Sequence, residues 1–563
     1  MDNTRLILAF VVSLVLIFVY QEVVLKRMFP PAAEQAAQKA KAEKAAEAAA
    51  LPNAPTAAAT AAAAIAAASP VAAAPAAAPT VAAVPVTPER IIQIDSDLFR
   101  AEITTRGARI KSFQLKRYRQ TVAADSPWYE MVAPAGKDAL LPLGAVLIRG
   151  GVTMDDHDLA YLTPAADRVE ITSHNKTSVE FIGKTADGLT ITKTFSFEPD
   201  TYVFNVAIAA TGGPAAQQVG LSMSQPLQAH AGYYDIPELQ ADVADQVITE
   251  TEKKLVAGVE PVSGTISYAG FGDRYFLSVL LPEQPASGTL TMAFGHDEAV
   301  ARVLFAGTSQ IHSRVYMGPK LLEALEAASP DLRRAIDFGW MGMLAIIFLR
   351  TLKLFHVVAP NYGVDILLVT VAVRVLSLPM SIKGQRSAMK LARLAPQLER
   401  LKEKYKDDQE QLQKETIDLY RRNHVNPIGG CAPMLIQLPI FIGLYEALLN
   451  AIELRQAPFI GWINDLSAPE CLPIPLMPQL PLLPCRGLPV LVILMALSGL
   501  LQQYMMPKQP DPTQQRMMMF TPLFYVFIFV RLPAGLVLYY FASNALGVIQ
   551  QYFLNREFSA GPT

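Results

Sequence analysis

Arg374 is the residue whose chemistry fits its surroundings least. It lies within residues 363–379, GVDILLVTVAVRVLSLP, an apolar stretch whose other charge, Asp365, stands near its start. From Asn361 to Met380 the segment has the roughly 20 residues that an α-helix needs to cross a bilayer. An arginine at that depth costs about 2.5–3.5 kcal/mol on insertion scales, so its presence there indicates a function.

A polar stripe surrounds this arginine. Thr370, Arg374 and Ser377 stand at i, i+4 and i+7 and therefore share one face of the helix. No Asp or Glu lies deep in any expected span, so the cation would attract water or a visiting anion. The alternative is that Arg374 only snorkels to the cytoplasmic interface past Pro379, about 8 Å further along the helix axis.

Other expected spans also carry polar residues in helical register. We expect them to face one hydrated cavity, open to the cytoplasm, that receives acidic or polar parts of a client chain. The alternative is ordinary hydrogen bonding between helices, which accounts for Ser and Asn better than for an unpaired Arg. The candidate groove residues are Arg374, Thr370, Ser377, Gln437, Ser498, Gln502, Tyr540 and Asn544.

The elements that position these residues are six expected transmembrane helices with both termini in the cytoplasm. Residues 381–426 hold eleven Lys and Arg, which places this segment on the cytoplasmic side. Leucines in steps of 3 and 4 predict two helices that fold back there as a hairpin, which is either a docking arm or a solvated loop. The expected spans are residues 6–25, 361–380, 427–450, 488–506, 517–530 and 536–554.

The rest of the 563-residue chain divides into segments of different composition. Short alternating runs and an Asp187-Gly188 turn predict an antiparallel β-sandwich outside the membrane. The segment after it should lie in the membrane interface as an amphipathic helix; a full span ending at Arg350 and Lys353 is the competing interpretation and would invert all that follows. We expect an anchor at 1–29, an Ala/Pro-rich linker at 30–88, the β-domain at 89–318, the interfacial region at 319–360 and the helical core, with its hairpin at 381–426, at 361–556.

Composition argues against several classes of function. The net charge is −2, so nothing indicates recognition of nucleic acid sequence. No histidine has the spacing of a metal ligand and no convincing nucleotide-binding loop occurs, so we expect neither a metal nor another cofactor. Cys471 and Cys485 share a Pro-rich loop, in which they either pair as a disulfide or remain free thiols.

Four motifs resemble the YidC/Oxa/Alb family of membrane protein insertases. They are NPIGGCAPMLIQLPIF (426–441), ELRQAPF (453–459), WINDLS (462–467) and LPAGLVLYYFASN (532–544). The order of anchor, linker, β-domain, interfacial helix, five core helices and hairpin is also similar. Two features depart from the family: Arg531 stands where an aromatic residue is expected, and the loop around Cys471 is longer and richer in Pro.

The resemblance implies an insertase without a chemical step, and hence not an enzyme, in the bacterial inner membrane. It implies a periplasmic β-supersandwich and a hydrophilic groove with Arg374 and Thr370 in it. It also implies an apolar slide for the client, for which Phe441 and Leu438 are candidates. The implied partners are nascent membrane proteins, the Sec translocon, the lipid bilayer, and a ribosome or targeting factors at the hairpin and C-terminus.

Two rival functions come from other classes. A secondary transporter would need a coupling carboxylate at mid-membrane and internally repeated halves, and the sequence shows neither. A sugar-binding envelope scaffold would use the β-domain but leaves Arg374 and the charged hairpin unexplained. The sequence therefore favours an insertase.

Overall fold

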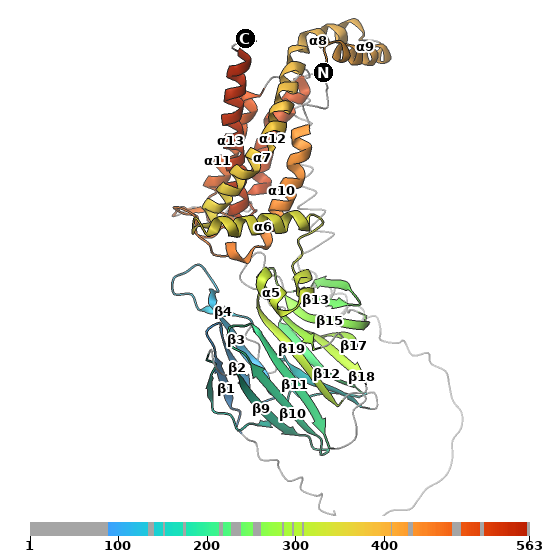
Figure 1. The fold of residues 1–563 in the computed structure, drawn as a ribbon, viewed down its shortest axis with the longest axis vertical. Helices are drawn as coiled ribbons and strands as arrows, with labels where there is room; N and C mark the ends of the chain where they lie inside the picture. Colours follow the sequence, from blue (N-terminus) through green and yellow to red (C-terminus); the bar gives the residue numbers. More distant parts are fainter. Residues whose placement is uncertain are drawn as a thin grey trace, which may run out of the picture. The chain divides into compact units, whose positions relative to one another are not determined.

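The fold of this chain consists of a β-rich part and a helical part that follow one another in the sequence (Figure 1). The computed structural model describes residues 88–132, 140–149, 152–172, 176–212, 218–226, 238–251, 260–283, 286–295, 298–306, 309–406, 408–425, 432–475, 483, 486–506 and 512–559. The expected N-terminal anchor and nearly all of the linker lie outside these residues.

A five-stranded sheet forms one layer of the β-rich part. Its strand order is β4-β3-β2-β1-β8. β1 pairs with β8 in parallel, whereas the other pairs in this sheet are antiparallel. The prediction of purely antiparallel sheets is wrong at this edge, because β8 returns to β1 through intervening strands and not through a hairpin. The strands are β1 (Ile91–Asp95), β2 (Phe99–Thr104), β3 (Arg109–Arg119), β4 (Trp128–Glu130) and β8 (Arg168–Glu170).

A fourteen-stranded sheet forms the second layer. Its order is β6-β5-β12-β18-β17-β15-β16-β19-β11-β10-β9-β7, with β13 and β14 joined at β15. The strands are β5 (Gly144–Arg149), β6 (Val152–Asp155), β7 (Tyr161–Leu162), β9 (Thr177–Lys184), β10 (Thr190–Phe197), β11 (Val203–Thr211), β12 (Gln218–Pro226), β13 (Glu238–Val243), β14 (Gln246–Thr251), β15 (Val262–Gly272), β16 (Phe276–Pro282), β17 (Ala286–Gly295), β18 (Glu298–Ala306) and β19 (Gln310–Pro319).

The β9–β10 hairpin shows why these segments form strands. Every second residue of β10 is buried, which is the period of a half-buried strand. Lys184 opposes Thr190 across the turn, and Gly188 there has φ +83°, a conformation that suits glycine. The hairpin predicted at Asp187-Gly188 is therefore confirmed.

Aromatic side chains from both sheets meet in the core. Phe99 of β2 lies 6.1 Å from Phe197 of β10, and Phe113 of β3 lies 6.1 Å from Phe204 of β11, measured between ring centroids. All four rings are buried. The two sheets thus pack face to face, as a sandwich requires.

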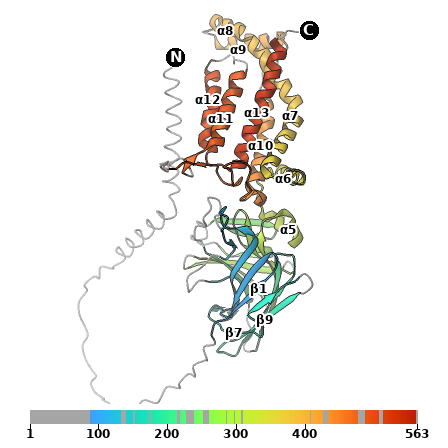
Figure 2. The same ribbon diagram turned by 90° about the vertical axis from the view of Figure 1, so that its left-hand side faces the viewer.

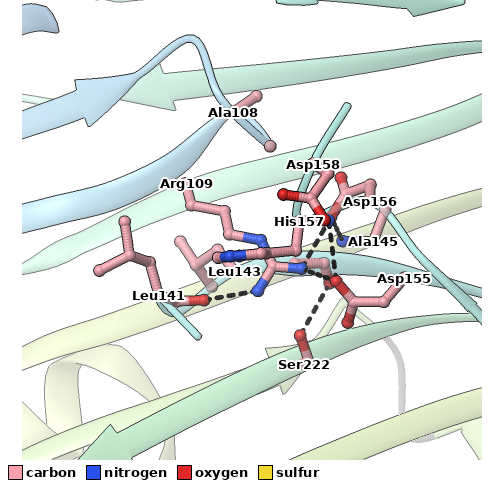
Figure 3. A network of polar contacts seen from close by, with 12 residues as sticks. Ala108, Arg109, Leu141, Leu143, Ala145, Asp155, Asp156, His157, Asp158 and Ser222 are labelled. Atoms are coloured by element: carbon pink, nitrogen blue, oxygen red, sulfur yellow. Dashed lines mark hydrogen bonds and ion pairs between the residues drawn. The ribbon is translucent and has the colours of Figure 1, made fainter. Parts of the chain in front are cut away.

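A buried ionic network lies within the β-rich part (Figure 3). Arg109 bonds both Asp155 and Asp156 and donates to the Leu141 carbonyl at 2.8 Å. Lys193, fully buried, lies 2.6 Å from Asp156 and donates to the carbonyls of Gly107 and Leu143. Burial lowers the pKa of Lys193 to about 8, an effect that the Asp156 carboxylate opposes. Arg109, Lys193 and Asp156 are therefore paired away from water, and Asp155 adds a second carboxylate from the exposed edge of the network.

The helical part begins after β19, and its longest helices run side by side in both views (Figure 1; Figure 2). Its elements are α5 (Leu322–Ala328), η2 (Pro330–Ala335), α6 (Gly342–His356), α7 (Tyr362–Arg393), α8 (Ala395–Lys404), α9 (Gln409–Arg422), α10 (Ala432–Asn450), η4 (Ile452–Leu454), β20 (Leu472–Pro473), β21 (Gly487–Leu488), α11 (Val490–Met505), α12 (Pro512–Phe529) and α13 (Ala534–Ser559).

α7 carries Arg374 and is longer than the apolar stretch suggested. Asn361 caps its first turn by accepting from the amides of Gly363 and Val364. The helix then continues through Pro379 to Arg393. Contacts with α13 support this continuation despite the proline, because Gln550 donates to Ser381 and to Gln385.

α6 begins later than the expected amphipathic segment. Its 15 residues span about 22 Å, less than the roughly 30 Å of a bilayer core. Phe348, Leu349 and Leu352 are buried, and α6 packs against α7 and α10. Met343 and Leu354 on its other side are 82% and 66% exposed. This division of the surface is typical of a helix in the membrane interface.

Span length does not settle how many helices cross the membrane. Among the described helices, α7 is the one long and apolar enough by length and composition, and α11 and Met518–Phe529 are shorter apolar helices. The count of six spans stays a prediction. In the loop before α11, Cys471 is disulfide-bonded; Cys485 and Cys431 lie outside the described residues.

We predict that Lys193→Met lowers the free energy of unfolding by about 3–5 kcal/mol, because it leaves the buried Asp156 short of a cation. Chemical unfolding of the full chain in detergent measures this. The matched control is Lys176→Met, since Lys176 is 77% exposed and pairs with Glu198 at the surface; its expected cost is about 0–1 kcal/mol. Equal losses in the two variants would contradict the prediction.

Candidate functional site

The Arg374 guanidinium is bound by neutral groups on α13. Its Nη2 donates to the Ser543 carbonyl at 2.7 Å and to the Ser543 hydroxyl at 2.8 Å, and its Nε donates to the same hydroxyl at 3.1 Å. Arg374 is partly buried and Ser543 is buried. No carboxylate of the described residues forms an ion pair with Arg374. The charge is thus hydrogen-bonded but not neutralised.

The geometry leaves part of the guanidinium available. An arginine has five N–H donors, and the hydrogen bonds of Arg374 to Ser543 use Nε and Nη2. Within the described part of the chain, Nη1 has no hydrogen-bond partner. Its two N–H groups can therefore meet water or an incoming carboxylate, which guanidinium groups bind well.

The two other polar residues of the α7 stripe bond to their own helix. The Thr370 hydroxyl donates to the Ile366 carbonyl at 2.6 Å, and Thr370 is fully buried. The Ser377 hydroxyl donates to the Arg374 carbonyl at 3.2 Å. Both residues lie on the same helix as Arg374, but each hydroxyl donates to a backbone carbonyl of α7 and not to another helix.

A second polar contact joins α10 to α13. Gln437 Nε2 donates to the Tyr539 hydroxyl at 2.8 Å. Tyr539 and Ser543 stand at i and i+4, so they share a face of α13. The structure therefore places Gln437 and Arg374 against successive turns of the same helix face. Our sequence analysis missed Tyr539 and Ser543, although both fall in the LVLYYFASN motif beside the residues it named.

The remaining polar candidates lie where α11 packs against α13. The Ser498 hydroxyl donates to the Met495 carbonyl at 2.8 Å, and Asn544 donates to the same carbonyl at 3.4 Å. Gln502 packs closely against Gly547 of α13: a Cβ atom added at Gly547 would lie only 2.7 Å from the side-chain nitrogen of Gln502. The structure does not bring these three into contact with Arg374.

Tyr540 lies in an aromatic cluster, from which it also interacts electrostatically with Arg374. Its ring lies 4.8 Å from Phe529, 5.7 Å from Phe441 and 5.8 Å from Tyr525. Phe441 thus connects α10 to α12 and α13. Leu438, one turn before it, is 57% exposed.

Large apolar side chains cover the outside of these helices. Leu376 is 84% exposed and Val375 is 64% exposed beside Arg374 on α7. An apolar surface of this extent is typical of contact with lipid. Others of the kind are Leu494, Leu497 and Leu501 on α11, Phe520, Leu523 and Phe527 on α12, and Ile549, Tyr552 and Phe553 on α13.

A helix bundle with an apolar outer surface and polar contacts inside, preceded by a two-layered β-domain, defines a membrane protein with a separate β-domain, and comparison with known proteins gives its class. Residues 353–561 match the family described as 60Kd inner membrane protein, and residues 91–350 match the YidC periplasmic domain. The membrane protein insertase YidC of Geobacter sulfurreducens is 32% identical over 83% of this chain and 86% of its own. That of Syntrophus aciditrophicus is 32% identical over 83% and 85%.

The chain belongs to the YidC family of membrane protein insertases, and it is a membrane protein with a periplasmic β-rich domain. A solved structure of an active YidC insertase covers 83% of this chain and 93% of its own, with 18% identity and a TM-score of 0.36.

We predict that Ser543→Ala lowers the free energy of unfolding by about 1.5–3 kcal/mol, because the Arg374 guanidinium loses its hydroxyl acceptor. Ser498→Ala serves as the control, since that hydroxyl bonds the carbonyl of its own helix, and it should change stability by about 0.5 kcal/mol or less. Thermal or chemical unfolding in detergent compares the two. A control as destabilised as Ser543→Ala would contradict this account of the site.

Proposed function

We propose that this insertase lowers the barrier to membrane entry with a hydrated groove built around Arg374. The polar part of a client segment enters the groove from the cytoplasm. Water and the guanidinium replace some of the hydration that its acidic residues lose. The groove residues are the eight candidates predicted from the sequence. Ser543 and Tyr539 on α13 accept hydrogen bonds from two of them, Arg374 and Gln437.

One observation supports this proposal above the others. Arg374 lies in an apolar helix and is bound by Ser543, a neutral residue, with no carboxylate partner in the described residues. A buried cation without a counter-ion is costly in hydrocarbon, so water or a passing anion is needed to stabilise it. A fixed ion pair would have removed that need.

The apolar part of the client then moves along the outside of the bundle. Leu438 and Phe441 on α10 form the expected slide, together with α12. Transfer of apolar surface from water to lipid supplies the driving force, about 25 cal/mol per Å². No chemical step is required.

We also propose a topology for the whole chain. Six helices span the inner membrane, and both termini lie in the cytoplasm. The chain is divided into the five domains predicted from the sequence: the anchor, the linker, the β-domain, the interfacial region and the helical core. α8 and α9 form a cytoplasmic docking arm for a ribosome or targeting factor, and the Sec translocon is a further partner. The density of Lys and Arg at residues 381–426 supports this orientation.

A transporter would need a mid-membrane carboxylate, and the described residues favour the insertase over it. Asp365 is fully buried, but it lies in the first turn of α7 and pairs with His356 at 2.7 Å. It is therefore at the end of the helix and is already partnered.

We predict that Arg374→Ala blocks clients with acidic translocated tails more than clients with neutral tails, and that Arg374→Lys has a milder effect because it keeps the charge. Insertion into liposomes made with the pure protein, without nucleotide, measures both client types. Arg386→Ala, in the same helix at an exposed ion pair with Glu557, is the control. Equal insertion of both client types by Arg374→Ala would refute the role of the groove.

Deletion of residues 394–420 tests the docking arm separately. We expect ribosome-fed insertion to fall while the protein remains folded, because α8 and α9 contribute few buried residues: Leu398 in α8 and none in α9. Co-translational and post-translational insertion are compared in the same liposomes. If both are unchanged, α8 and α9 are not a docking arm.

A further inference from the structure

A cavity of about 780 Å³ lies between the β-rich part and α6, away from Arg374. Strands β13, β14 and β15 form one wall, and η2, the following turn and the first half of α6 form the other. Its lining combines charged groups, among them Arg333, Arg350, Glu238 and Asp337, with apolar ones on α6. The mixture indicates a ligand with both a charged and an apolar part.

Two arginines in this cavity are available to a ligand. Arg333 and Arg350 are exposed and form no hydrogen bond or ion pair with other described residues. Arg334 also lines the cavity, but it donates to Asp242 at 3.0 Å and lies 3.5 Å from Asp245. Arg333 and Arg350 are therefore the arginines of this cavity without an ion-pair partner among the described residues, although Arg350 also interacts at longer range with Glu323, and a guanidinium suits a phosphate.

Two carboxylates line the same cavity. Glu238 begins β13, and no described residue donates a hydrogen bond to its side chain. Asp337 accepts from the Gly339 amide at 2.8 Å through one oxygen. Two arginines and two carboxylates that form no ion pair with described residues line one cavity, an arrangement that complements a zwitterion better than an anion.

The floor and rim of the cavity complete the site. Tyr268 is fully buried, lines the cavity, and its hydroxyl has no partner in the described part of the chain. A buried hydroxyl without a partner indicates a missing acceptor. At the rim, Met343 and Ile347 on α6 are 82% and 52% exposed and continue the cavity as an apolar surface.

We propose that this cavity binds the headgroup of an aminophospholipid, a phosphoethanolamine ester. Arg333 and Arg350 bind the phosphate, Glu238 and Asp337 accept from the ammonium group, and the acyl chains lie along Met343 and Ile347. A choline headgroup has no N–H to donate, and a glycerol headgroup has no positive charge for the carboxylates. The site anchors α6 to a lipid and does not depend on the groove at Arg374.

Competition between headgroups tests the proposal. The full chain is equilibrated in detergent micelles that contain equal amounts of dioleoyl phosphatidylethanolamine, phosphatidylcholine and phosphatidylglycerol, and retained lipid is counted by native mass spectrometry. We expect one retained phosphatidylethanolamine, preferred over phosphatidylcholine on the order of tenfold, the effect of losing a charge-assisted hydrogen bond. Equal retention of the three lipids, or no retention, would overturn the assignment.

Two double variants separate the two halves of the headgroup. Arg333→Gln with Arg350→Gln should reduce phosphatidylethanolamine retention about tenfold or more, since both phosphate donors are lost. Glu238→Gln with Asp337→Asn should abolish the preference over phosphatidylcholine while phospholipid is still retained. Arg486→Gln, an exposed arginine outside the cavity, is the control and should bind as the original protein does.

A soluble headgroup identifies the contribution of the acyl chains. Glycerophosphoethanolamine carries the same charges without acyl chains, so it should compete weakly with the lipid. Melting in detergent without lipid shows whether the variants are folded, and exposed arginines without partners should leave it unchanged. Unchanged retention in the arginine variant, or equally tight binding of the soluble headgroup, would refute a lipid site here.

Discussion

The contact between Arg374 and Ser543 is the interaction on which this site depends. A guanidinium inside an apolar bundle needs acceptors, and Ser543 supplies a carbonyl and a hydroxyl within 2.8 Å. These acceptors orient the group without cancelling its charge. Because both come from one residue of α13, the packing of α7 against α13 fixes where the cation lies.

Ionisable side chains at the end of the bundle near α6 have ionisable partners, unlike Arg374. His356 pairs with the buried Asp365 and stacks on Tyr362 with ring centroids 3.8 Å apart. Lys353 lies between Glu323 and Glu453 at 2.7 and 2.6 Å. The ion pairs there join α5, α6, α7 and η4 to one another, so they serve the structure. Lys353 has two carboxylate partners, whereas Arg374 has none among the described residues, so the lack of a counter-ion is particular to Arg374.

The ELRQAPF motif (453–459), one of the four that resemble the family, also connects the helical part to the β-rich part. Arg455 donates to the Arg119 carbonyl at 2.8 Å, and its guanidinium lies 5.0 Å from the Tyr129 ring and 5.2 Å from the Phe276 ring. These three partners belong to β3, β4 and β16. A motif read as part of the helical core therefore has its arginine in contact with the β-rich part.

Sequence periodicity predicted the helices and the β9–β10 hairpin because burial there follows the period of the element. It did not predict the parallel β1–β8 pair, since strand pairing across a long separation leaves no local pattern. The sequence identified Arg374 because a charged residue within an apolar stretch can be recognised without knowledge of the structure. It missed Ser543 because a serine in a membrane helix is unremarkable until its neighbour across the helix interface is known.

A cation that is oriented but not neutralised suits a protein whose clients must leave as well as enter. A carboxylate partner on the protein would compete with the client, and removing a charge from a buried pair costs about 3–5 kcal/mol. A bare cation would bind an acidic residue too strongly in a dry site. Serine lies between these cases, because its oxygens satisfy two of the three guanidinium nitrogens and leave Nη1 for transient contacts. Binding that is favourable enough to admit a charge yet weak enough to release it is also the requirement for conduction through a channel. The same physical compromise would let Arg374 assist one client after another.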